Sequence, residues 1–142
     1  MSKHETPLIL RYWERVGGVL IEEFQLVKRD ATSGPRRADA VIVLHEPRDQ
    51  LRAGRRAGVD LEGKDVIVIQ AKAERLSLTL MGQGVFSAQL MKRFKPKSVK
   101  AVILCTKDDA TLRPLLVPFA NVEVEVMPHI VSPNEATTDE QK

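Results

Sequence analysis

The sequence lacks several features that would each define a class of protein. Its 142 residues include one cysteine, Cys105, which excludes a disulfide framework and a cysteine-based zinc site. No apolar run approaches the roughly 20 residues that a membrane-spanning helix needs. The first residues also lack the apolar stretch of a signal peptide, so we expect a cytoplasmic protein with no membrane partner.

A strong excess of charge of either sign is lacking as well. The chain has 22 basic and 19 acidic residues and a formal net charge of +3, which permits nucleic-acid binding without requiring it. The distribution is more informative than the sum, because acidic residues gather in 122–142. Basic residues are concentrated in residues 28–37, 48–56 and 92–100.

The pattern of apolar residues predicts an α/β fold with a mixed central sheet flanked by helices. Helices are expected at residues 6–18 and 78–94, and strands at residues 19–27, 38–44, 64–72, 99–106 and 122–126. A short helix is expected from Asp108 or Asp109 to Leu116. The polar, arginine-rich residues 46–63 are interpreted as an excursion between two strands. Together we expect one domain over residues 1–130 and a disordered tail over residues 131–142.

Three polar residues interrupt strands that are otherwise apolar: Asp39, Gln70 and Lys72. Polar groups in such strands cost stability unless they are paired or used. Asp39 offers a hard oxygen ligand for Mg²⁺, and the Gln70 amide and the Ala71 carbonyl offer two more. Lys72 would then position or deprotonate a water and offset charge in phosphodiester hydrolysis. The alternative is a structural ion pair between Asp39 and Lys72.

These residues lie in segments that resemble the PD-(D/E)XK nuclease superfamily, which has a restriction-endonuclease-like αβββαβ core. The resemblance rests on Arg37–Val43 around the aspartate and on Asp65–Lys72 around the Gln-x-Lys motif. The element order covers about residues 5–106. The layout is most similar to small Holliday-junction-resolvase-like nucleases, in which a helix glutamate, a glycine, a Ser-Gly loop and an aspartate follow one another. The corresponding residues here are Glu5, Gly17, Ser33, Gly34 and Asp39.

The resemblance implies a DNA endonuclease, a hydrolase that depends on Mg²⁺ or Mn²⁺ and acts as a homodimer. It implies Asp39 and Gln70 as metal ligands, Lys72 as the catalytic lysine and Glu5 as an additional acid. Gln70 departs from the usual Asp or Glu of the motif, and a neutral ligand lowers Mg²⁺ affinity. A catalytically inactive protein of the same fold that binds nucleic acid or a protein partner is therefore the alternative.

Two further glutamates compete with Glu5 for the role of the additional acid, Glu14 in the first helix and Glu22 in the first strand. Glu22 shares a strand face with apolar residues, so its carboxylate needs a partner. That partner is either a metal or a cation, and Arg36, Arg37 and Lys72 are the cations considered.

Basic side chains around these segments are expected to contact phosphates, which gives affinity without sequence preference. The alternative interpretation is a solvated surface. The residues concerned are Arg36, Arg37, Arg48, Arg52, Arg55, Arg56, Lys92, Arg93 and Lys95. In the helix after the motif, Gln83 and Gln89 are either site residues or part of a polar helix surface.

Overall fold

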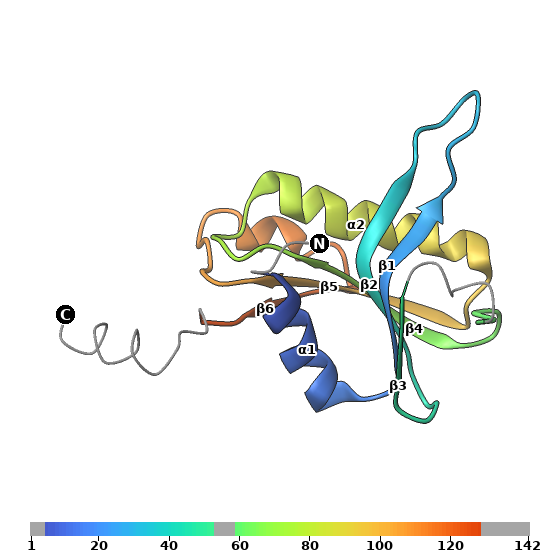
Figure 1. Ribbon diagram of the computed structural model, residues 1–142. Coiled ribbons are helices and arrows are strands. Elements are labelled where there is room, and N and C mark those ends of the chain that lie inside the picture. The colour runs from blue at the N-terminus through green and yellow to red at the C-terminus, as the bar shows by residue number, and fades with distance from the viewer. Residues whose placement is uncertain (1–4, 53–58, 129–142) are drawn as a thin grey trace.

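The computed structural model describes residues 5–52 and 59–128, which form an α/β structure with a six-stranded mixed sheet (Figure 1). The helices are α1 (Glu5–Val16), α2 (Leu78–Met91) and the 3₁₀ helices η2 (Lys92–Phe94) and η3 (Arg113–Leu116). The strands are β1 (Val19–Val27), β2 (Arg36–Val43), β3 (Asp49–Arg52), β4 (Asp65–Ala71), β5 (Ser98–Cys105) and β6 (Val122–Val126). The predicted α/β class with a mixed sheet is confirmed.

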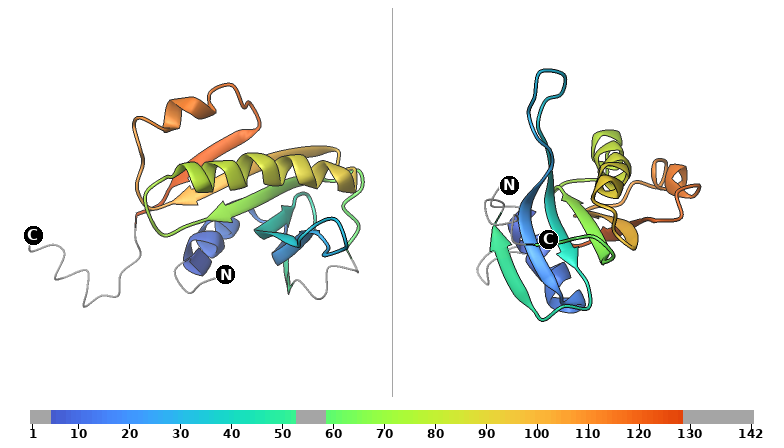
Figure 2. Two further views of the ribbon diagram at one scale, coloured as in Figure 1. Left: turned by 90° about the horizontal axis from the view of Figure 1, so that it is seen from above. Right: turned by 90° about the vertical axis from the view of Figure 1, so that its right-hand side faces the viewer.

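The strand order across the sheet is β3-β1-β2-β4-β5-β6. β1 pairs with β2 and β2 with β4 in antiparallel fashion, whereas the remaining pairs are parallel. α1 and α2 lie on opposite sides of this sheet (Figure 2). No helix in residues 5–52 and 59–128 is long and apolar enough to cross a membrane.

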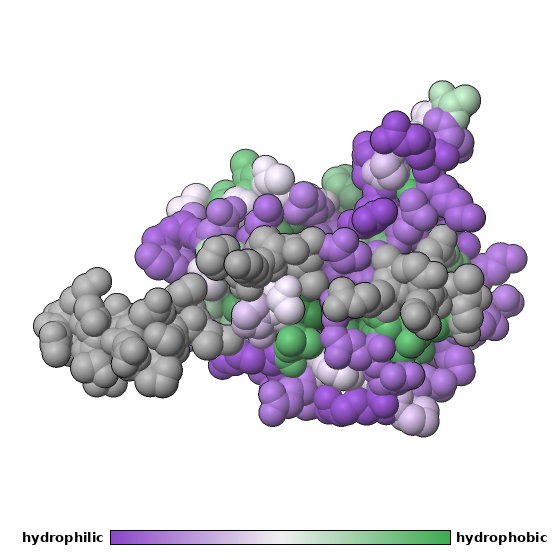
Figure 3. All heavy atoms as spheres, in the orientation of Figure 1, coloured by the Kyte–Doolittle hydropathy of each residue, from purple (hydrophilic) through white to green (hydrophobic). Residues whose placement is uncertain are grey.

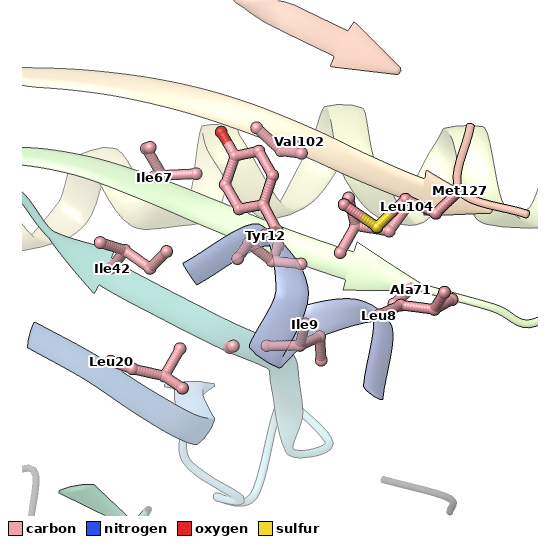
Figure 4. Packing of buried hydrophobic residues seen from close by; sticks show 12 residues of the cluster. Leu8, Ile9, Tyr12, Leu20, Ile42, Ile67, Ala71, Val102, Leu104 and Met127 are labelled. Atoms are coloured by element: carbon pink, nitrogen blue, oxygen red, sulfur yellow. The ribbon is translucent and has the colours of Figure 1, made fainter. Parts of the chain in front are cut away.

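Two separate apolar layers hold the helices to the sheet. Under α1, the side chains of Ile9 and Tyr12 pack on Ile42, Ile67 and Val102 of three neighbouring strands (Figure 4). On the other face of the sheet, α2 packs on β4 and β5 through buried apolar residues. The β-branched residues of β4 are covered on both faces, as a continuous apolar run in a central strand predicts.

Residues 46–63, interpreted as an excursion between two strands, do connect β2 to β4, but they also contain the strand β3, which was not predicted. β3 has the sequence Asp-Gln-Leu-Arg and pairs with β1 at the edge of the sheet. A strand of four residues at an edge needs no apolar alternation, so its sequence looks like that of a polar loop. Residues 53–58 lie outside the described residues.

The second helix is shorter than predicted, since α2 ends at Met91 and η2 follows it. Lys95 adopts a left-handed conformation, with φ 58°, and its backbone N–H donates to the Lys92 carbonyl. This turn ends the helical run within the basic segment of residues 92–100. The predicted tail of residues 131–142 lies outside the described residues.

Two glycines in α2 differ in the space around them, and this difference predicts opposite effects of alanine substitutions on stability. A Cβ at Gly84 would lie 2.5 Å from Cγ1 of the buried Ile103, whereas a Cβ at Gly82 would meet nothing within 4 Å. We expect Gly84→Ala to destabilise the protein by about 1–3 kcal/mol through overpacking. Gly82→Ala should stabilise it by about 0.5–1 kcal/mol because alanine favours the helix.

Urea denaturation of both variants beside the wild type measures this difference. Equal shifts of the two midpoints would contradict the close approach of α2 to β5.

Strands β1 and β2 extend beyond the body of the sheet as a hairpin arm, which we define as residues 25–37 (Figures 1 and 2). A turn closes its tip, where the Asp30 carboxylate accepts hydrogen bonds from the N–H groups of Thr32 and Ser33, both at 2.7 Å. These hydrogen bonds lower the pKa of Asp30. At the base, the rings of Phe24 and Phe94 pack edge to face with 5.2 Å between their centroids. Hydrogen bonds thus order the tip of the arm, and aromatic packing anchors its base.

Candidate functional site

A cavity of about 430 Å³ opens where β2 and β4 separate. The two strands pair only as far as Ala40 and Ile69, and beyond that point β2 continues into the arm with β1. Helix α1 contributes Glu5 to the cavity, and α2 forms another part of its wall. The residues of the strands that line it are Leu26, Arg36, Arg37, Asp39, Gln70 and Ala71, and Lys72 lines it directly after β4. The structure therefore brings the three predicted central residues together with Glu5, Arg36 and Arg37.

The Asp39 carboxylate joins the two diverging strands. Its Oδ2 accepts a hydrogen bond of 2.8 Å from the backbone N–H of Ala71. The side chain takes the place of a backbone acceptor, because β2 does not pair with β4 in the residues that precede Ala40. Because the N–H and the C=O of one strand residue point to the same side, the Ala71 carbonyl is directed to the same gap. One carboxylate and one carbonyl thus converge on the fork between the strands.

The pKa of Asp39 is raised, and the main cause is burial of the carboxyl group. The hydrogen bond from Ala71 acts in the opposite direction, and the negative charges of Glu5 and Glu23 raise the pKa further. A bound cation would favour the ionised form of Asp39 and so would oppose both the burial of the carboxyl group and the negative charges of Glu5 and Glu23. This environment suits a position where positive charge is to be bound.

Gln70 is held in a fixed orientation and is 6% exposed. Its Nε2 donates to Ser87 Oγ of α2 at 2.7 Å and to the Arg37 carbonyl at 3.4 Å. With the amide nitrogen committed to these acceptors, Oε1 is the coordinating atom that the side chain can offer. Ser87 was not identified from the sequence, where a serine within a helix carries no signal of this contact.

Lys72 follows the end of β4, and its side chain is exposed at the cavity. Its backbone N–H donates to the Leu104 carbonyl of β5 at 3.0 Å, which fixes the chain at this point. The alternative of a structural Asp39–Lys72 ion pair is not supported, since no ion pair joins these two described side chains and Lys72 is not among the charges that shift the Asp39 pKa.

The three glutamates considered for the additional acid lie in different places. Glu5 lines the cavity, and its charge affects Asp39. Glu14 is exposed on α1, and Glu22 accepts a hydrogen bond from Nε2 of Gln50. Neither of the latter two lines the cavity among the described residues. The sequence predicts a metal or a cation as the partner of Glu22, and the structure adds the amide of Gln50 in β3 as a neutral partner.

The basic residues predicted to contact phosphates are divided among three places. Arg36 and Arg37 line the cavity, and Arg37 also lies 3.6 Å from the Glu23 carboxylate. Arg48 lies over the Trp13 ring, 4.8 Å from its centroid, and so belongs to the α1 side of the sheet. Lys92, Arg93 and Lys95 lie at η2 and directly after it. The side chain of Arg52 and the whole of Arg55 and Arg56 lie outside the described residues.

Of the two helix glutamines, Gln83 lines the cavity, whereas Gln89 is exposed elsewhere on α2. Within the part of the chain that the structure describes, no three His, Cys, Asp or Glu side chains form a cluster that could hold a metal ion. The donors at the fork are instead a carboxylate, an amide oxygen and a backbone carbonyl. Mg²⁺ is often bound through only one or two carboxylates and keeps several waters, so an oxygen-only donor set of this kind suits it.

Comparison of the chain with protein-family models, with curated proteins and with solved structures found no match. The arrangement of residues at the fork is therefore the basis for the functional argument.

Proposed function

We propose that this chain is a metal-dependent phosphodiesterase of the PD-(D/E)XK type, and more specifically a DNA endonuclease. The observation that carries the proposal is the fork, where the Asp39 carboxylate of β2 accepts a hydrogen bond from the Ala71 N–H and lines the same cavity as Gln70 of β4 and Lys72, which follows β4. The elements α1, β1, β2, β4, α2 and β5 follow the αβββαβ order of that superfamily, with β3 as an addition. This order supports the assignment.

The proposed site binds Mg²⁺ or Mn²⁺ through the Asp39 carboxylate, Gln70 Oε1 and the Ala71 carbonyl, with Glu5 as the additional acid. When bound, such a cation polarises the scissile phosphate and stabilises the charge that develops on it. The Lys72 ammonium positions the attacking water and offsets the same charge. Arg36 and Arg37, at the mouth of the cavity, hold the neighbouring phosphates.

One site cuts one strand, so a substrate cut on both strands requires two copies of the site. The proposal therefore includes a homodimer. A supercoiled plasmid tests this part, because a dimer with both sites engaged converts it directly to the linear form. Accumulation of nicked circles through the whole reaction would contradict it.

A second candidate function is a catalytically inactive protein of the same fold that binds nucleic acid. The observation that favours it is Gln70, which stands where the superfamily usually has Asp or Glu. Its amide nitrogen donates hydrogen bonds to Ser87 Oγ and to the Arg37 carbonyl, and these contacts favour an uncharged glutamine over a carboxylate at this position. This protein would shift DNA in a gel and cut none of the forms tested with either metal.

The substitution Asp39→Asn tests the proposed function through two measurements with opposite signs. Cleavage of linear, nicked and branched DNA with Mg²⁺ or Mn²⁺ should be lost, because the anionic ligand is gone. Without metal, the variant should melt at a higher temperature than the wild type at pH 8. The folded-state pKa of Asp39 is raised, so the stability that its neutral form contributes is lost as the pH rises through that pKa.

The Tm advantage of Asp39→Asn should therefore grow as the pH rises from about 4, the ordinary pKa of an aspartate, and be absent below it. The exposed Asp60→Asn, outside the cavity, is the matched control and should change neither quantity. Cleavage by Asp39→Asn at the wild-type rate would rule out the proposed site.

A further inference from the structure

One large apolar side chain of the cavity is strongly exposed. Phe86 of α2 lines the cavity together with Asp39 and Lys72, yet 66% of its surface is exposed. Leu26 and Leu90 line the same cavity and are largely covered, and with Phe86 they make up the apolar part of its lining, which we call the apolar wall. Single exposed apolar residues are common on protein surfaces, but this one lies beside the groups to which we assign hydrolysis.

Basic side chains continue from this wall along the arm. A second hollow, of about 570 Å³, shares Leu26 and Leu90 with the cavity and includes Lys28 and Arg93 in its lining. Arg36 and Arg37 line the cavity itself. The arm carries four basic residues and one acidic residue, and its surface is largely hydrophilic in Figure 3.

An exposed aromatic ring beside a track of cations is the arrangement by which proteins bind unpaired strands. The cations follow the phosphates, and the ring stacks on a base. In an intact duplex each base is already stacked on its neighbours, so its face is not available to a side chain. The apolar wall therefore discriminates between the two forms of DNA, which the phosphate contacts alone do not.

We infer that the cavity takes an unpaired DNA strand, as in a flap or at a branch, with one base stacked on Phe86. This inference rests on the proposed function, because it supplies the substrate class of that same site. Phe86 and Asp39 line the same cavity, so a strand that stacks on Phe86 lies in the cavity that holds the proposed metal site.

The test compares binding of a labelled single-stranded oligonucleotide with binding of its matched duplex, at one ionic strength and without divalent metal. Base–aromatic stacking is worth about 1–3 kcal/mol per base, so Phe86→Ala should weaken single-strand binding by roughly 5- to 150-fold. Duplex binding should stay unchanged. Phe86→Trp should restore single-strand binding, which a loss of folding would not allow.

Leu78→Ala is the matched control. Leu78 is 64% exposed on the same helix but does not line the cavity, so its truncation should leave both affinities unchanged. Equal losses on the two DNA forms with Phe86→Ala, no loss on either, or a wild-type preference for duplex would each overturn the inference. Cleavage by the wild type with metal is measured separately. If the wild type cuts DNA but Phe86→Ala binds single strands normally, the proposed nuclease function stands and the stacking on Phe86 is refuted. If the wild type cuts no DNA but Phe86→Ala loses single-strand binding, only the nuclease function is refuted.

Discussion

Replacing Lys72 with alanine is expected to lower metal-dependent cleavage by about 10²- to 10³-fold or more, because a group that stabilises transition-state charge typically contributes that much. The Lys72 side chain is exposed at the cavity, and only its backbone N–H takes part in the sheet. The fold should therefore remain intact while the reaction is lost. Single-turnover rates with excess protein measure the chemical step without interference from product release.

Lys107→Ala is the matched control for this substitution. Lys107 is an exposed lysine just after the end of the adjacent strand β5, outside the cavity. It should cleave like the wild type, and both variants should melt within a degree or two of it, as exposed substitutions usually do. A Lys72→Ala variant that cuts DNA at the wild-type rate would refute the assigned mechanism.

Much of the fold was predictable because its strands bury apolar faces, and burial leaves a pattern in the sequence. The strand bounds of Val19–Val27 and Val122–Val126 agree with the predicted ranges. β3 was not predicted because an edge strand of four residues has few apolar side chains to bury. The earlier end of α2 was not predicted because the end of this helical run depends on the left-handed conformation of Lys95. Neither feature produces a recognisable pattern of residues in the sequence.

The centre of the site was also predictable, because charged or amide side chains inside apolar strands are conspicuous. The surrounding contacts were not. Glu23 has a positive φ of 53°, which interrupts the alternation of β1 and allows its charge to affect Asp39. Ser87 meets Gln70 only through the packing of α2 on β4. Such contacts arise from tertiary packing, which a local pattern of residues does not contain.

Gln70→Glu is expected to destabilise the metal-free protein at neutral pH by about 1–3 kcal/mol, the cost of leaving buried polar groups without suitable partners. The Gln70 amide nitrogen donates to the Arg37 carbonyl and to Ser87 Oγ. A carboxylate at this position would direct an oxygen at the Arg37 carbonyl, which has no proton to offer. The Ser87 hydroxyl can reverse and donate, so only one of the two contacts is retained.

The same substitution should increase the response to metal. A second carboxylate beside Asp39 strengthens Mg²⁺ binding, and a ligand bound only by the folded state stabilises it by about 2.7 kcal/mol at 100 times its Kd. We therefore expect Mg²⁺ to raise the Tm of Gln70→Glu more than that of the wild type. Thermal unfolding in EDTA and in Mg²⁺ measures both parts of this prediction.

Gln89→Glu introduces the same charge on the exposed surface of α2, outside the cavity, and should reproduce neither effect. A Gln70→Glu variant that melts like the wild type in both buffers would argue against a metal at the fork. The cleavage assay on these proteins then separates the two candidate functions. An active wild type supports the nuclease with a neutral ligand, whereas cleavage gained only with Gln70→Glu indicates an inactive nuclease fold in which Gln70 blocks the reaction.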